Sequence, residues 1–249
     1  MGPLITCMSC LIEEGTPNLD MIEVKINEDG IYRHICSKGH ITYTITQSMK
    51  FEDLFEIAIS ALLDEYTREA IASSTAALER FYEFCIKIFL SRNGVSLELI
   101  KEVWKLVNSQ SERQLGAYYF LYLNALKQKP ITLSNNSISF RNNVIHKGKI
   151  PNSQEAFEYL KEVYKCIFDT LKILERVYEK EIQMMIEENL KIKNKKILEY
   201  IEKGARINTL CGGYFLNLAV KNEVETTFEI KFEEYKKQVI LLKRYLKTY

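Results

Sequence analysis

The sequence predicts a mainly α protein with a small β segment at its N-terminus. The 249 residues include only 10 Gly and 4 Pro, which favours long regular elements joined by few loops. Apolar and β-branched residues alternate in the first 48 residues, whereas apolar residues recur at helical spacing from about Met49 onward. Because one core usually serves about 100 to 200 residues, we expect a small domain at 1–48, a helical domain at 49–190 and a helical extension at 191–249.

The N-terminal segment is expected to form short strands. Residues 21–26 and 41–46 alternate apolar and β-branched side chains, as a half-buried strand does. Asn27-Glu28-Asp29-Gly30 follows the first of these segments with residue types that favour a tight turn. We therefore expect a small sheet in the first 48 residues.

Helices are expected from Met49 onward. Apolar spacing predicts either two helices between 49 and 92 or one helix with a break near 64–67. Ser96, three residues before Leu99, should open a short helix that contains Trp104, and a further helix should cover 112–126.

The second half of the helical region begins with a capping signal. Asn152 with Glu155 three residues later should cap a long helix that runs past Ile186. The remaining segments are expected as a helix near 197–203, a break at 211–213 and a final amphipathic helix over 225–246.

Charge and hydropathy argue against a membrane partner, and they leave any binding of RNA to a local patch. The formal net charge is +1, from 34 basic and 33 acidic side chains, so no global field draws the protein onto nucleic acid or an anionic membrane. Apolar runs such as 57–63 are far shorter than the roughly 20 residues that span a bilayer. The first residues also lack the pattern of a secretion signal. We expect a cytoplasmic protein with no membrane partner.

Two pairs of residues near the N-terminus have the spacing of zinc ligands. Cys7 and Cys10 form a C-x₂-C pair, and Cys36 and His40 form a C-x₃-H pair. Together they would complete a tetrahedral shell with no open position, which indicates a structural Zn²⁺ rather than a catalytic ion. A segment of ~45 residues buries too little apolar surface to fold alone, so the metal would supply the missing stability. The arrangement resembles a zinc ribbon.

Alternatives to this ligand set remain at the level of the sequence. His34 lies two residues before Cys36 on an expected strand, so it competes with His40 as the fourth ligand. Cys7 and Cys10 could instead be incidental thiols. We expect the other three cysteines, Cys85, Cys166 and Cys211, to be buried free thiols.

A second cluster of polar residues lies at 141–146. If 139–147 is a helix, Asn142 and His146 share one face, and we expect Arg141 about 40° from that face. With the other two histidines assigned to the zinc cluster, His146 is left for proton transfer. An imidazole, a guanidinium and an amide suit metal-independent cleavage of an RNA phosphodiester. The plainer alternative is an Arg and a His in a solvated loop.

Phe140-Arg141-Asn142-Asn143-Val144-Ile145-His146-Lys147-Gly148, followed by a long helix, resembles the R-x₄-H signature of the HEPN superfamily. The resemblance covers roughly 50–190. It implies an α-helical bundle, a homodimer, catalytic Arg141 and His146 with accessory Asn142, and no cofactor for catalysis. It also implies an endoribonuclease acting on tRNA or other cellular RNA, of a toxin or antiviral defence type, with an antitoxin or regulatory protein as a further partner.

Other residues are weaker candidates for the same function. Glu79 and Glu83 could line the cleft, although we expect ordinary solvated carboxylates. The tyrosines at 118, 119 and 122 could stack on bases, and the lysines at 191–196 and 236–247 could follow an RNA backbone, but helical spacing favours core aromatics and solvated faces. A non-catalytic adaptor that binds nucleic acid or protein is the alternative function. A hydrolase that uses the cysteine cluster is disfavoured by the closed ligand shell.

Overall fold

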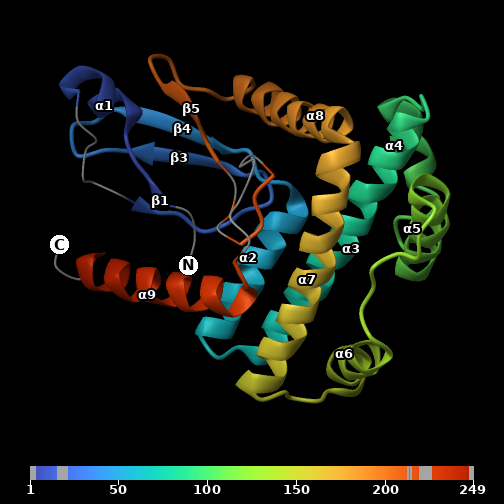
Figure 1. Ribbon diagram of the computed structural model, residues 1–249. Coiled ribbons are helices and arrows are strands. Elements are labelled where there is room, and N and C mark those ends of the chain that lie inside the picture. The colour runs from blue at the N-terminus through green and yellow to red at the C-terminus, as the bar shows by residue number, and fades with distance from the viewer. Residues whose placement is uncertain (1–3, 16–21, 212, 214, 219–225, 247–249) are drawn as a thin grey trace. The chain divides into compact units, whose positions relative to one another are not determined.

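The computed structural model describes residues 4–15, 22–211, 213, 215–218 and 226–246. The chain divides into two compact units, and each combines two stretches of sequence. The first contains Met1–Asp53 with Ile186–Glu225, and the second contains Leu54–Met185 with Thr226–Tyr249. The mainly α fold with a small N-terminal β region is confirmed (Figure 1).

The first unit is built on a three-stranded sheet with the order β3-β4-β5. The neighbours β3 (Ile31–Ile35) and β4 (Ile41–Thr46) are antiparallel, and β5 (Arg206–Leu210) adds to β4 in parallel. The remaining elements here are β1 (Leu4–Ile5), α1 (Met8–Glu14), β2 (Ile22–Glu23), which pairs antiparallel with β1, and the C-terminal half of α8 (Glu179–Leu198).

Local turn chemistry and a small core explain this unit. Gly30 ends the expected turn with φ 60°, and its N–H donates to Asn27 Oδ1 at 2.8 Å. Tyr43 and Ile45 of β4 pack with Ile31 and with Ile197 of α8, all buried. Burial of these side chains on one side of the sheet fixes its register, since a slip of one residue would turn them to the other side.

The last part of the chain differs from expectation. Instead of a separate helical extension at 191–249, it contributes β5 to the first unit and α9 (Phe228–Leu246) to the second. The domain boundaries expected at 48/49 and 190/191 therefore do not coincide with those of the compact units. The reason for β5 is non-local, because its hydrogen-bonding partner β4 lies more than 160 residues earlier.

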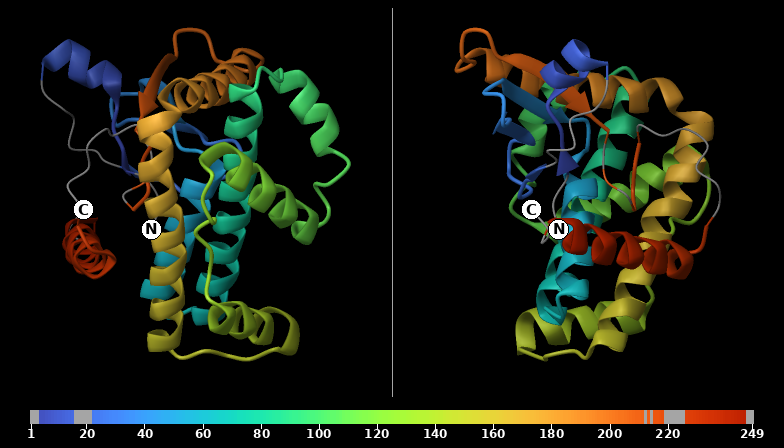
Figure 2. Two further views of the ribbon diagram at one scale, coloured as in Figure 1. Left: turned by 45° about the vertical axis from the view of Figure 1, so that its right-hand side comes forward. Right: turned by 90° about the vertical axis from the view of Figure 1, so that its left-hand side faces the viewer.

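The second unit is a set of packed helices. Figure 2 shows α3 and α7 side by side, with α6 lying across the end of the pair where both helices begin. The helices of this unit, with the N-terminal half of α8, are α2 (Lys50–Leu63, from Leu54 onward), α3 (Thr67–Arg92), α4 (Leu97–Trp104), α5 (Ser111–Leu126), α6 (Asn135–Lys147), α7 (Ser153–Val177) and α9.

Aromatic rings fill the core of the second unit. Tyr82 of α3 stacks on Tyr118 of α5 with ring centroids 4.3 Å apart. Phe89 of α3 meets Tyr122 of α5 edge-on at 6.1 Å. Because rings of this size bury large apolar areas, these contacts hold α5 against α3, which carries the polar residues described below.

Helix ends follow the local signals in most places. The expected break near 64–67 separates α2 from α3, and Glu65 there has φ 63°. The capping box is confirmed, since Glu155 N–H donates to Asn152 Oδ1 at 2.9 Å and Asn152 N–H donates to Glu155 at 3.0 Å. The long helix ends at Val177 rather than past Ile186, because buried Tyr178 leaves helical geometry.

Two further expectations concern the end of α8 and the membrane. The expected helix at 197–203 is not formed, since α8 ends at Leu198 and a turn follows. No described helix is long and apolar enough to cross a bilayer.

Candidate functional site

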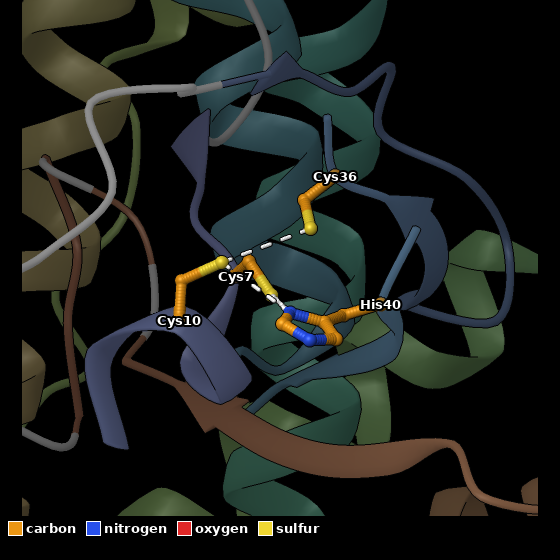
Figure 3. Close-up of side chains that lie close together, drawn as sticks. All are labelled: Cys7, Cys10, Cys36 and His40. Carbon is orange, nitrogen blue, oxygen red and sulfur yellow. Dashed lines mark hydrogen bonds between the residues drawn. The ribbon is translucent and has the colours of Figure 1, made fainter. Parts of the chain in front are cut away.

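The four expected zinc ligands come together from two parts of the first unit. Cys7 precedes the first turn of α1 and Cys10 lies within that turn. Cys36 and His40 flank the turn between β3 and β4, where Gly39 has φ 81° and its N–H donates to the Cys36 carbonyl at 2.9 Å. Figure 3 shows the four side chains pointing toward one another.

The distances between the ligand atoms suit one tetrahedral ion. All four atoms lie within 4.8 Å of one another, and Cys10 Sγ is 3.8 Å from Cys36 Sγ and 3.4 Å from His40 Nδ1. With Zn–S near 2.3 Å and Zn–N near 2.0 Å, an ideal tetrahedron separates two sulfurs by about 3.8 Å and sulfur from nitrogen by about 3.5 Å. The Cys₃His cluster therefore fits zinc in size and in the chemistry of its donors.

The surroundings of the cluster favour thiolates. Burial alone would raise the pKa of the Cys7 thiol, but hydrogen bonds from the Cys10 backbone and from Thr42, His40 and Cys36 together lower it to about 6. His40 Nε2 lies 3.3 Å from a Glu13 carboxylate oxygen, which orients the ring so that Nδ1 faces the sulfurs. The three cysteines are buried, so a bound ion would be shielded from solvent on their side.

The structure separates the expected ligands from the alternatives. His34 is buried on β3 and does not belong to the metal-binding cluster, which takes His40 as its fourth member. Cys85 and Cys166 are buried free thiols, as expected. The expectation is wrong for Cys211, which is exposed. Cys211 directly follows β5, and β5 is an edge strand of the sheet.

The Arg141–His146 segment is helical, as the sequence predicts. Ser134 caps the start of α6 by accepting from Ser137 N–H at 3.2 Å. Gly148, with φ 73°, ends the helix and donates its N–H to the Asn143 carbonyl. Val144 is fully buried and anchors the helix, so the polar residues around it have fixed directions.

The three expected catalytic residues do not share one face of α6. Asn142 and His146 are one turn apart on the same side, and His146 is exposed in the last turn. Arg141 lies about 100° from Asn142 and about 140° from His146, since each residue turns the helix by about 100°. The expected offset of 40° is therefore wrong, and one chain does not place the guanidinium beside the imidazole.

Arg141 instead lines a pocket formed by α3, α5, α6 and α7. The pocket has a volume of about 100 Å³, and Glu79, Tyr119 and Tyr159 line it together with Arg141. Burial raises the pKa of Glu79, and the charge of Arg141 opposes this shift. Glu79 is therefore not an ordinary solvated carboxylate.

Among the other candidate residues, Glu79 and Tyr119 line this pocket and the rest of those described do not. Glu83 forms ion pairs with Arg80 and Lys87 and does not line the pocket. Tyr118 and Tyr122 are core residues, while half-exposed Tyr119 lines the pocket.

Two lysines of the 191–196 run, Lys193 and Lys196, make contacts within the first unit. Lys193 donates to the Thr46 carbonyl at 2.8 Å and to the Ser48 carbonyl at 3.1 Å. Lys196 forms an ion pair with Asp29. These contacts favour a structural role for both side chains.

Comparisons with protein-family models, with curated proteins and with solved structures give no match to this chain. The likeness to the HEPN superfamily therefore depends on the residues of the motif itself and stays a prediction.

Proposed function

We propose that the helical unit is a metal-independent endoribonuclease that uses the 2′-hydroxyl of its RNA substrate as the nucleophile. The observation that supports this most is the exposure of His146 in the last turn of α6, one turn after Asn142. An imidazole there can accept the proton of the 2′-hydroxyl or donate one to the leaving 5′-oxygen, and Asn142 can orient it. The 2′-oxygen bonds to phosphorus as the P–O5′ bond breaks, which leaves a 2′,3′-cyclic phosphate and a 5′-hydroxyl.

The other parts have supporting roles in this proposal. Arg141 binds RNA from its pocket, and the zinc at Cys7, Cys10, Cys36 and His40 stabilises the first unit without taking part in the reaction. The chain acts as a homodimer, which is proposed from the motif resemblance alone. A role as a toxin or antiphage effector, held by an antitoxin or regulatory protein, is proposed from the motif resemblance alone.

One observation favours a second candidate function. Arg141 and His146 leave α6 about 140° apart, and a guanidinium directed away from the imidazole suits a non-catalytic adaptor that binds nucleic acid or protein. Such an adaptor would bind RNA without turnover and would not respond to a change at His146.

The chemistry is tested with zinc-loaded protein and RNA in a buffer without magnesium or other added divalent ions. We expect fragments with 2′,3′-cyclic phosphate and 5′-hydroxyl ends, identified by end-group analysis. A matched RNA with a 2′-deoxynucleotide at the cleaved position should stay intact, because it lacks the nucleophile. Binding of both RNAs without cleavage would favour the adaptor, and cleavage of the deoxy-substituted RNA would exclude the proposed mechanism.

A further inference from the structure

The pocket that holds the side chains of Glu79 and Arg141, called here the Glu79–Arg141 pocket, has the composition of a ligand site. Aliphatic side chains from three helices and from the segment before α6 form its walls, and these are Leu78, Leu115, Ile138 and Leu133. A few polar groups converge on this apolar surface, among them Glu79 and Arg141. Apolar walls with a small number of converging polar groups are typical of sites that orient a small ligand.

Arg141 lines this pocket and carries an unsatisfied donor. Its Nε atom is buried and has no hydrogen-bond partner in the described part of the chain. Buried polar atoms in folded proteins are nearly always paired, so an exception needs an explanation. A guanidinium can only donate hydrogen bonds, so a ligand that binds beside Arg141 is expected to carry an acceptor.

Glu79 contributes hydrogen-bond acceptors to the same pocket. An ionised carboxylate only accepts hydrogen bonds, through two oxygens. Glu79 lies on α3 and Arg141 on α6, and both side chains line the same pocket. A ligand that fits must therefore present donors toward α3 and acceptors toward α6, which disfavours a simple anion such as phosphate.

The size and the rings of the pocket favour the edge of a planar group. A volume of about 100 Å³ is below the roughly 300 to 1,000 Å³ of sites that enclose a whole drug-sized ligand, so the pocket suits one flat ring of a larger ligand. Half-exposed Tyr119 lines it and offers a face on which a flat ring can stack. Tyr82, also in the lining, is held by its stack on Tyr118.

We infer that the Glu79–Arg141 pocket binds a guanine base of single-stranded RNA, an inference that rests on the proposed function. Guanine N1–H and the N2 amino group are two adjacent donors that match the carboxylate of Glu79. Guanine O6 and N7 are acceptors that match the fork of Arg141, the commonest specific contact of that base. Adenine, cytosine and uracil do not combine two adjacent donors with two acceptors, so they leave a pocket group unpaired.

Nucleoside monophosphates test this inference without any cleavage, because they contain no phosphodiester. The zinc-loaded wild-type protein is titrated by calorimetry with guanosine, inosine and adenosine 3′-monophosphates. Inosine lacks only the N2 amino group. We expect guanosine monophosphate to bind roughly tenfold or more tightly than either of the others, as the loss of a paired contact predicts.

Matched variants identify the residues that read the base. Glu79→Gln should bind guanosine and inosine monophosphates about equally, and Arg141→Lys should weaken both guanosine and inosine binding. Glu83→Gln, the same change one turn further along α3 and outside the pocket, should keep the wild-type preference. Thermal unfolding shows whether each variant is folded, and the comparison of guanosine with inosine on the wild-type protein needs no variant.

Either of two results overturns the inference. One is equal or absent binding of the three nucleotides to the wild-type protein, and the other is a guanosine preference that Glu79→Gln leaves unchanged. These results are independent of the ribonuclease proposal. RNA cleavage with no guanosine preference would remove the pocket assignment alone, whereas a clear guanosine preference with no cleavage would remove the ribonuclease alone.

Discussion

Arg141 and His146 lie five residues apart on α6, and their side chains leave the helix about 140° apart, with Arg141 in a pocket and His146 exposed. A guanidinium in that position can hold RNA, but within one chain it does not lie beside the group that would transfer protons. The two residues are therefore expected to differ in what their removal does to catalysis.

Replacement of Arg141 by alanine should act mainly on binding. We expect KM for RNA to rise about tenfold or more, from the loss of a charged hydrogen bond, while kcat changes less. Steady-state kinetics measure the two constants separately. KM reports RNA binding when the chemical step is slower than dissociation of the substrate. Arg113→Ala, an exposed position on α5 outside the pocket, is the matched control. A fall in kcat with unchanged KM would place Arg141 at the scissile phosphate instead.

The Cys₃His cluster predicts one zinc ion per chain. Mutation of a residue that contacts a metal ligand lowers metal affinity by about 10- to 100-fold. Loss of a ligand itself, in Cys10→Ser, should therefore lower zinc affinity by more than about 100-fold. Because the metal is expected to hold α1 against the β3–β4 turn, the thermal midpoint should fall as well. Cys211→Ser, which changes an exposed cysteine outside the cluster, should alter neither property. Metal analysis of the purified proteins and thermal unfolding measure both, and full zinc content in Cys10→Ser would contradict the assignment.

Glu52 predicts a pH dependence of stability in the first unit. Its carboxyl group is buried and accepts hydrogen bonds from Met49 N–H at 2.6 Å and Leu218 N–H at 2.8 Å. Burial raises its pKa from 4.5 to about 8, against the effect of these hydrogen bonds. Between those pH values the folded protein binds more protons than the unfolded chain, so stability should fall as the pH rises from about 5 to about 8. The loss should be on the order of a few kcal/mol.

Urea unfolding at several pH values checks this prediction. Glu52→Gln should flatten most of the slope, with a remainder from Asp53, whose pKa burial also raises. Glu98→Gln, at an exposed position on α4, should keep the wild-type slope. An unchanged slope in Glu52→Gln would show that other groups cause the pH dependence.

Local signals made much of the fold predictable. Ser96 as the cap of α4, the Asn152–Glu155 box of α7 and the ligand spacings of the zinc cluster depend on residues at most four positions apart. The direction of Arg141 was also open to prediction, because the helical period alone separates it from His146 by about 140°.

Non-local packing accounts for the features that the sequence did not reveal. Strand β5 shows no clear alternation of buried and exposed residues, and it forms through its pairing with β4. The place of Glu79 in the pocket depends on how α3 packs against α6, which no pattern within α3 indicates. Tyr118 and Tyr122 are core residues whereas Tyr119 is not, and the difference between them is the side of α5 on which each one lies.

The most direct test of the ribonuclease proposal compares the wild-type protein with His146→Ala on the same RNA, with Lys147→Ala as the control one residue away. Loss of a group that transfers protons in the transition state should slow single-turnover cleavage by about 100- to 10,000-fold, with the same affinity for RNA and the same thermal midpoint. Lys147→Ala should keep a rate close to that of the wild type. Cleavage by His146→Ala at the wild-type rate would contradict the proposal.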